Sequence, residues 1–219
     1  MSDIEMIFAR IHEEGFEHYI SVLEEIANSK SSEARAKVAA CLCEYNNEDA
    51  ERILLKLLFD KCIYVRVEAA DSLSSFNSFN AYQALKKCTE NRYFLLRGYS
   101  LYGLSQTVPL NYKDEAQKIL EHSLLEEKNT FVKICIRTAL YTLGNTVQLK
   151  KLFFMYNKCG YRNKCAILNS ISDLVDNDFV SQLKDIQEFV GSIIVGKDDI
   201  AVMSSLERLK NAIESRAIM

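Results

Sequence analysis

Glu68 and Asp71 are the residues of this chain whose types and spacing could perform acid–base chemistry. They stand three positions apart, so on a helix both carboxylates could reach one ligand. Acid–base catalysis, however, needs a desolvated pocket that drives the pKa values of two such groups apart. The sequence places no nucleophile or histidine in the same region. We therefore predict no catalytic residues and interpret both carboxylates as binding residues.

The histidines and cysteines do not follow the spacing of a known metal-binding motif. The chain has three histidines and seven cysteines, and no two cysteines form a Cys-x-x-Cys pair. Cys159 and Cys165, which straddle a predicted turn, are the one pair worth testing for zinc or oxidation. Metal ligands must converge at close spacing, so we expect no metal site and no cofactor. Reduced thiols favour a cytoplasmic location.

A basic residue followed seven positions later by an aliphatic residue recurs along the chain. Arg35, Arg66 and Arg97 begin three copies at a step of 31 residues. Lys133 and Lys164 begin two more, and a sixth copy starting at Asp199 has lost the basic residue. A repeat of this length is typical of stacked helical hairpins.

The elements that must carry these residues are helices. A single proline, Pro109, and only seven glycines disfavour a turn-rich β fold. We predict a leading helix at 3–14, closed by Gly15, and then six helix pairs in one domain, 1–219. The predicted repeats cover about 17–45, 48–76, 79–106, 113–143, 146–175 and 178–214. In the second helix of each pair, the positions three, seven and ten after the basic residue share one face and should form the core.

The stretch from Asp60 to Leu73 carries a further pattern, Asp60-x4-Val65-Arg66-x3-Ala70-x2-Leu73. It resembles the HEAT-repeat superfamily, in particular the short HEAT-like repeats first named from phycobilisome lyases. The resemblance covers nearly all of residues 17–215. It implies an all-α fold, an α-α superhelix (HEAT-like solenoid) of about six helical hairpins whose second helices line the concave face.

Two acidic residues stand six positions before a basic residue: Asp60 before Arg66, and Glu127 before Lys133. Each could contact that basic residue. The resemblance implies that such residues form a structural ladder between neighbouring repeats. The predicted ladder residues are Arg35, Asp60, Arg66, Arg97, Glu127, Lys133 and Lys164.

The outward positions of the second helices provide the predicted binding surface. Two tyrosines one turn apart offer stiff apolar faces with polar tips, which interfaces favour. Nearby carboxylates would select a basic partner. The predicted partner-binding residues on the concave face are Glu44, Glu68, Asp71, Tyr99, Tyr102 and Gln106. The insertion Gln106–Tyr112 is either a hinge or contact site, or a tolerated surface insertion.

Composition limits the function further. A net charge of −3 provides no basic footprint for nucleic acid. HEAT-like DNA glycosylases have a basic groove with tryptophans, and this chain, which has no tryptophan, departs from that pattern. Its apolar stretches are too short to span a membrane. We expect a non-enzymatic protein–protein interaction module: a scaffold, an adaptor or a regulatory or neutralising protein. The alternatives are a lyase-like or other enzyme using the concave groove, or nucleic-acid binding. The oligomeric state stays open.

Overall fold

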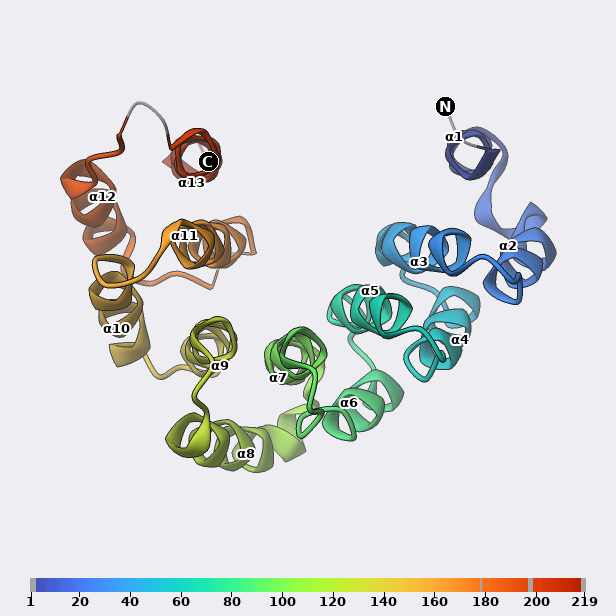
Figure 1. The fold of residues 1–219 in the computed structure, drawn as a ribbon, viewed down its shortest axis with the longest axis horizontal. Coiled ribbons are helices and arrows are strands. Elements are labelled where there is room, and N and C mark those ends of the chain that lie inside the picture. The colour runs from blue at the N-terminus through green and yellow to red at the C-terminus, as the bar shows by residue number, and fades with distance from the viewer. Residues whose placement is uncertain (1–2, 178, 197–198, 218–219) are drawn as a thin grey trace. The chain divides into compact units, whose positions relative to one another are not determined.

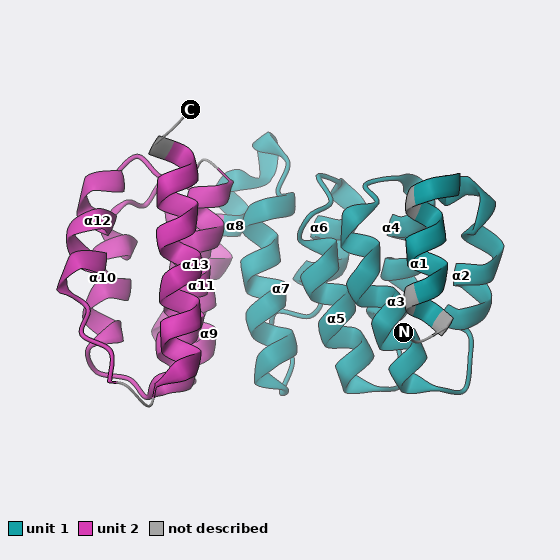
Figure 2. Cartoon of the chain, turned by 90° about the horizontal axis from the view of Figure 1, so that it is seen from above, with its two compact units in different colours: residues 1–116 teal, residues 117–219 magenta. Residues whose placement is uncertain are grey.

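The computed structural model describes residues 3–177, 179–196 and 199–217. In these ranges every regular element is helical, with thirteen α-helices and three short 3₁₀ segments. The chain divides into two compact units, Met1–Ala116 and Gln117–Met219, which are described separately (Figure 2). Among the described helices, none has both the length and the apolar character needed to cross a bilayer.

Unit 1 is a stack of helix pairs in two layers (Figure 1). The helices α2, α4 and α6 form one layer, and α3, α5 and α7 form the other. The elements of this unit are α1 (Asp3–Glu14), α2 (Ile20–Ala27), α3 (Ser32–Cys41), α4 (Glu48–Leu57), α5 (Ile63–Leu73), α6 (Phe79–Lys86) and α7 (Phe94–Thr107), with the 3₁₀ segments Phe16–His18, Leu42–Glu44 and Leu110–Tyr112.

Unit 2 repeats the arrangement, with α9, α11 and α13 in one layer and α10 and α12 in the other (Figure 1). Its helices are α9 (Thr130–Thr142), α10 (Val147–Tyr156), α11 (Tyr161–Asp176), α12 (Leu183–Ser192) and α13 (Ile200–Ala217). The helix α8 (Lys113–Glu126) contains the boundary between the two units.

The predicted all-α class, with a leading helix and helical hairpins, is confirmed. Several helix ends differ: the first helix of repeat one begins at Ile20 after a 3₁₀ turn, and its second helix ends at Cys41, followed by the 3₁₀ turn Leu42–Glu44. Tightening of this kind is common at helix ends. The predicted sixth repeat starts at residue 178, outside the described residues, and its first helix runs over Leu183–Ser192. One continuous domain over 1–219 stays a prediction.

The core follows the repeat. The positions three, seven and ten after each basic residue are buried in every predicted repeat, except that Tyr45 is half-buried. Thr107, the polar exception in this pattern, is fully buried, and its Oγ1 donates a 2.9 Å hydrogen bond to the carbonyl oxygen of Gly103. This bond satisfies the hydrogen-bonding need of the buried hydroxyl. A threonine can therefore occupy a core position that is hydrophobic in the other repeats.

Local signals set the helix ends. Ser31, Asn47, Ser78 and Asn129 each accept a hydrogen bond from the backbone N–H three residues on, which caps α3, α4, α6 and α9. Gly15 follows α1 with φ +98°, a conformation that glycine adopts without strain. The caps at Ser31 and Asn129 fix where the second helices α3 and α9 start, and therefore where Arg35 and Lys133 lie.

Candidate functional site

Arg35 and Asp60 form the first connection between repeats. Nε and Nη2 of Arg35 donate to the two carboxylate oxygens of Asp60 at 2.7 and 2.8 Å. The guanidinium also donates to the carbonyl oxygens of Ser29 and Lys30, and only 4% of the arginine side chain is exposed. The bond from Arg35 holds the pKa of Asp60 below its usual value. This pair is a structural element of the ladder.

The partner of Asp60 differs from the one expected. Sequence spacing suggested Arg66, six residues on, but the carboxylate binds Arg35, 25 residues back, and accepts the N–H of Cys62. Asp60 lies in the loop before α5, beside the start of α3, so it reaches the preceding repeat. Arg66 shares a cavity of about 370 Å³ with Asn91, which again stands 25 residues later.

The remaining predicted ladder residues have other surroundings. Arg97 donates to the carbonyl oxygen of Asn91 at 2.6 Å. Glu127 accepts the backbone N–H groups of Lys128 and Asn129 at 2.9 and 2.8 Å, before the start of α9. The ammonium of Lys164 lies 5.2 Å from the centre of the Tyr156 ring. Arg35 and Asp60 form an ion pair between repeats, and the structural role of the other ladder residues stays a prediction.

Glu44 and Asp71 lie at one end of the α3–α5 pair, around Cys43. Both are exposed. Burial raises the pKa of the Cys43 thiol, and the charges of Glu44 and Asp71 raise it further. Hydrogen bonds from Ser72 to the Ala39 carbonyl (2.8 Å) and from Ser75 to the Cys43 carbonyl (3.3 Å) join the two helices at this point. The structure thus brings two predicted partner-binding residues together.

The other predicted binding residues are half-buried: Glu68 on α5 and Tyr99, Tyr102 and Gln106 on α7. Burial raises the pKa of Glu68. Nε2 of Gln106 lies 3.5 Å from Oγ of Ser105. Binding by these four residues stays a prediction. Because each is half-buried, only part of its side chain is accessible to a partner.

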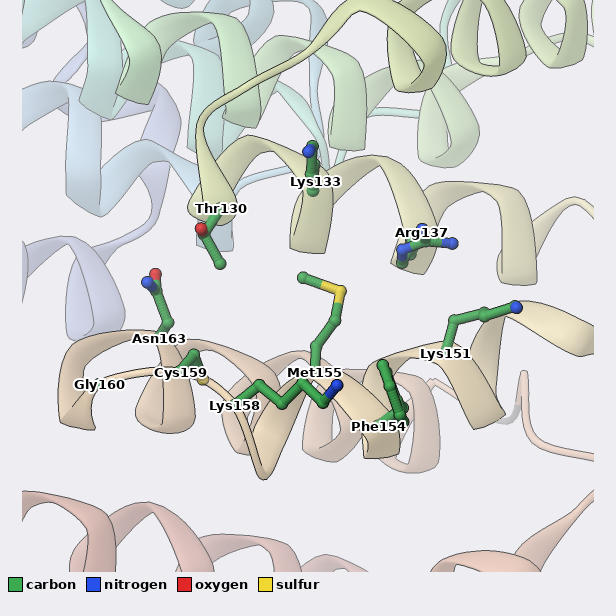
Figure 3. Close-up of a pocket in the computed structure, with 10 residues that line it drawn as sticks. All are labelled: Thr130, Lys133, Arg137, Lys151, Phe154, Met155, Lys158, Cys159, Gly160 and Asn163. Carbon is green, nitrogen blue, oxygen red and sulfur yellow. The ribbon is translucent and has the colours of Figure 1, made fainter.

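Unit 2 contains a basic cavity of about 610 Å³ between α9, α10 and the start of α11 (Figure 3). One side is formed by α9 and the other by α10 and the residues that follow it (Figure 3). Ten residues line this cavity: Thr130, Lys133, Arg137, Lys151, Phe154, Met155, Lys158, Cys159, Gly160 and Asn163. Four of them are cations and none is acidic.

The four cations of the basic cavity lack acidic neighbours within bonding distance. In the described part of the chain, Lys133, Arg137, Lys151 and Lys158 take part in no ion pair. Arg137 donates to Oε1 of Gln148 at 2.6 Å, while its buried Nε has no hydrogen-bond partner within the described ranges. Burial lowers the pKa of Arg137. Lys158 lies 4.1 Å from the centre of the Phe154 ring.

The sequence analysis missed the basic cavity, although a signal was present. Thr130, Lys133 and Arg137 fall at helical spacing on α9. Lys151, Phe154 and Lys158 fall at helical spacing along α10 and the turn after it. The repeat pattern indicates only a ladder role for Lys133, and it gives no information about the outward charges of the first helices.

Aromatic side chains gather at the starts of α5 and α7 in unit 1. Tyr64, at the start of α5, is 63% exposed. The Tyr64 ring meets the Tyr93 ring edge to face, with 6.5 Å between their centres. Tyr93 also lines the cavity that holds Arg66. Exposed aromatic residues beside arginine are typical of protein interfaces, so this cluster is a second surface that sequence spacing did not reveal.

Within the described ranges, no group of three or more histidine, cysteine, aspartate or glutamate side chains could hold a metal ion. Cys159 and Cys165 are both free thiols, half-buried. Within the described residues, no third candidate ligand joins this pair to form a metal site, so zinc binding or oxidation there stays a hypothesis.

Comparison with known proteins identifies the repeats. Residues 20–105 match the family model of HEAT repeats. A search of curated proteins returned no match. Among solved structures, the complex of CpcE and CpcF of phycocyanin lyase from Nostoc sp. PCC7120 aligns with 16% identity and a TM-score of 0.47, over 90% of this chain and 94% of that one. An engineered protein aligns with 15% identity and a TM-score of 0.40, over 90% of this chain and 97% of its own.

Proposed function

Residues 20–105 are HEAT repeats, and on that premise we propose that the chain is a non-enzymatic module that binds a basic protein partner. The binding surface is the acidic face of unit 1, formed by Glu44, Glu68 and Asp71 on the α3–α5 pair. Tyr99 and Tyr102 of α7 extend it. The framework below this surface is a packed core, so the surface is formed before a partner arrives.

One observation carries the proposal: Glu44 and Asp71 are both exposed where hydrogen bonds from Ser72 and Ser75 join the ends of α3 and α5. Exposed carboxylates on one face of a protein repel each other. Cationic side chains of a partner would relieve this repulsion and also speed association. The third carboxylate, Glu68, is already partly buried and its pKa is raised, so a neighbouring cation would favour its charged form.

The exposure of this surface favours binding over catalysis, because Glu44 and Asp71 are both open to solvent. Glu68 is half-buried and Asp71 exposed. General acid–base pairs work in closed sites where water is excluded. An exposed surface with a few charged and aromatic groups suits recognition of another protein.

The test is affinity capture with the wild type and the double variant Glu44→Lys, Asp71→Lys. We expect the variant to lose a basic partner that the wild type retains, and added salt to weaken the wild-type complex. The control is Glu90→Lys, Asp114→Lys, which makes the same change of net charge at two exposed acidic residues elsewhere in unit 1. Circular dichroism and thermal unfolding must show that all three proteins fold alike.

The outcomes separate the possible sites. Equal loss of the partner in both charge variants would show that net charge, and no particular face, governs binding. A partner retained by the double variant but lost by Tyr64→Ala would move the site to the aromatic cluster at the starts of α5 and α7. Chemical conversion of a small molecule that copurifies with the wild type would replace the binding proposal with an enzyme.

A further inference from the structure

In the basic cavity of unit 2, a lysine stands at the position where the first ladder step has an aspartate. Arg35 meets Asp60, 25 residues later, and Arg66 shares a cavity with Asn91 at the same step. From Lys133 the same step leads to Lys158, and both lysines line the basic cavity. Aspartate, asparagine and lysine thus stand at equivalent positions, so the place of a carboxylate is taken by a second positive charge.

Such an arrangement costs stability without an anion. Two further cations, Arg137 and Lys151, line the same space, and no carboxylate lines it. A half-buried guanidinium whose buried Nε makes no hydrogen bond in the described structure is poorly solvated. An oxyanion in the cavity would supply the missing acceptor and the missing negative charge.

Other groups of the cavity suit the same ligand. Gly160, the N-cap of α11, and Asn163 in its first turn both line the cavity, so the positive end of the helix dipole lies beside it. Thr130 and Asn163 add neutral donors. The Phe154 ring, against Lys158, provides an apolar wall for the group that carries the anion.

We propose that this cavity binds a phosphate monoester. A phosphate dianion has three terminal oxygens and matches several cations better than a single carboxylate does. The volume of the cavity lies within the range of about 300–1,000 Å³ found for ligand pockets. A phosphorylated side chain of a protein and a small phosphate ester share this chemistry. The site lies wholly within unit 2 and is independent of the acidic face of unit 1.

The test measures binding of a fluorescent peptide with one phosphoserine and neutral flanking residues, by fluorescence anisotropy at low ionic strength. The same peptide without phosphate is the first control. We expect only the phosphorylated peptide to bind the wild-type chain. Competition with free O-phosphoserine then separates the sources: tighter binding of the peptide indicates a phosphoprotein, and equal binding indicates a small phosphate ester.

The decisive variant is Lys158→Glu, which restores an acid at the ladder position. It should weaken phosphopeptide binding by about tenfold or more, the effect of losing one charge-assisted hydrogen bond. Its thermal stability should equal or exceed that of the wild type, because the new carboxylate would face Lys133. The matched control is Lys184→Glu on α12, an exposed lysine that does not line the cavity, with an expected change of less than about twofold.

If Lys158→Glu fails to fold, the double variant Lys133→Gln, Lys151→Gln provides the same test through neutral side chains. Three results would overturn the proposal: no preference of the wild type for the phosphorylated peptide, unchanged affinity in the cavity variants, or an equal loss in Lys184→Glu. Tighter binding of a single-stranded oligonucleotide, which has only phosphodiesters internally, would also overturn it in favour of a nucleic-acid surface.

Discussion

Arg35 and Asp60 are joined by two parallel hydrogen bonds, of 2.7 and 2.8 Å, between the start of α3 and the loop before α5. The arginine also bonds the backbone at Ser29 and Lys30, and Asp60 bonds the backbone at Cys62. Both side chains are mostly buried. The pair therefore joins the α2–α3 loop of one repeat to the α4–α5 loop of the next.

Replacement of Asp60 by asparagine should destabilise unit 1. The change leaves the buried charge of Arg35 without a counter-charge, which costs about 3 kcal/mol. Chemical denaturation followed by circular dichroism measures the loss. The substitution Glu90→Gln, at an exposed residue, is the control and should change the free energy of unfolding by less than about 0.5 kcal/mol.

The stability lost in Asp60→Asn should depend on pH. Arg35 lowers the pKa of Asp60 in the folded chain, so this carboxylate contributes its full stability above its unfolded pKa of about 3.9. That contribution disappears as the pH falls through the lower, folded pKa. The difference in stability between the wild type and Asp60→Asn should therefore shrink below about pH 4. A difference independent of pH would contradict the ion pair.

The thiols of Cys62 and Cys43 should differ in reactivity in the direction opposite to their exposure. Hydrogen bonds from the backbone N–H groups of Val65 and Tyr64 lower the pKa of Cys62, whereas burial and the charges of Glu44 and Asp71 raise that of Cys43. The thiolate is the reactive form. Near neutral pH, half-buried Cys62 should react with iodoacetamide faster than exposed Cys43, as measured by mass spectrometry of tryptic peptides.

A matched variant connects this reactivity to the acidic face. In Glu44→Gln, Asp71→Asn, the pKa of Cys43 should fall and its alkylation should accelerate, while Cys62 should be unaffected. Unchanged alkylation of Cys43 would mean that the two carboxylates do not lie close to it. The electrostatic argument for a basic partner would then fail.

Two glycines of unit 2 should respond in opposite directions to alanine. Gly144 ends α9 with φ +105°, and the N–H of Asn145 bonds the Leu140 carbonyl across it at 3.0 Å. Alanine there should cost about 1–2 kcal/mol, because its Cβ clashes in a left-handed conformation. Gly191 is exposed within α12, with open space around it, so Gly191→Ala should stabilise the helix by up to about 1 kcal/mol.

Thermal unfolding of both glycine variants measures these effects. The wild type and the two variants should keep the same helix content by circular dichroism. A stabilising effect of Gly144→Ala would show that α9 does not end in a left-handed turn. A destabilising effect of Gly191→Ala would show that α12 is not a continuous helix at that residue.

The acidic face shows how far spacing along the chain can predict a site. The offsets from the basic residue correctly placed Glu44 and Asp71 at exposed positions. They could not show that both lie around Cys43, because that depends on the pairing of the ends of α3 and α5 through Ser72 and Ser75. Nor could they show that Glu68 is half-buried by its neighbours.

The sequence by itself determined the helical hairpins, the caps and the buried positions of each second helix, because these follow from periodicity and hydrogen bonding within a few residues. Only the tertiary structure decided that Asp60 meets Arg35 and that Lys133 shares a cavity with Lys158. Both relationships cross from one repeat to the next. They depend on how neighbouring hairpins pack, and no local spacing encodes that register.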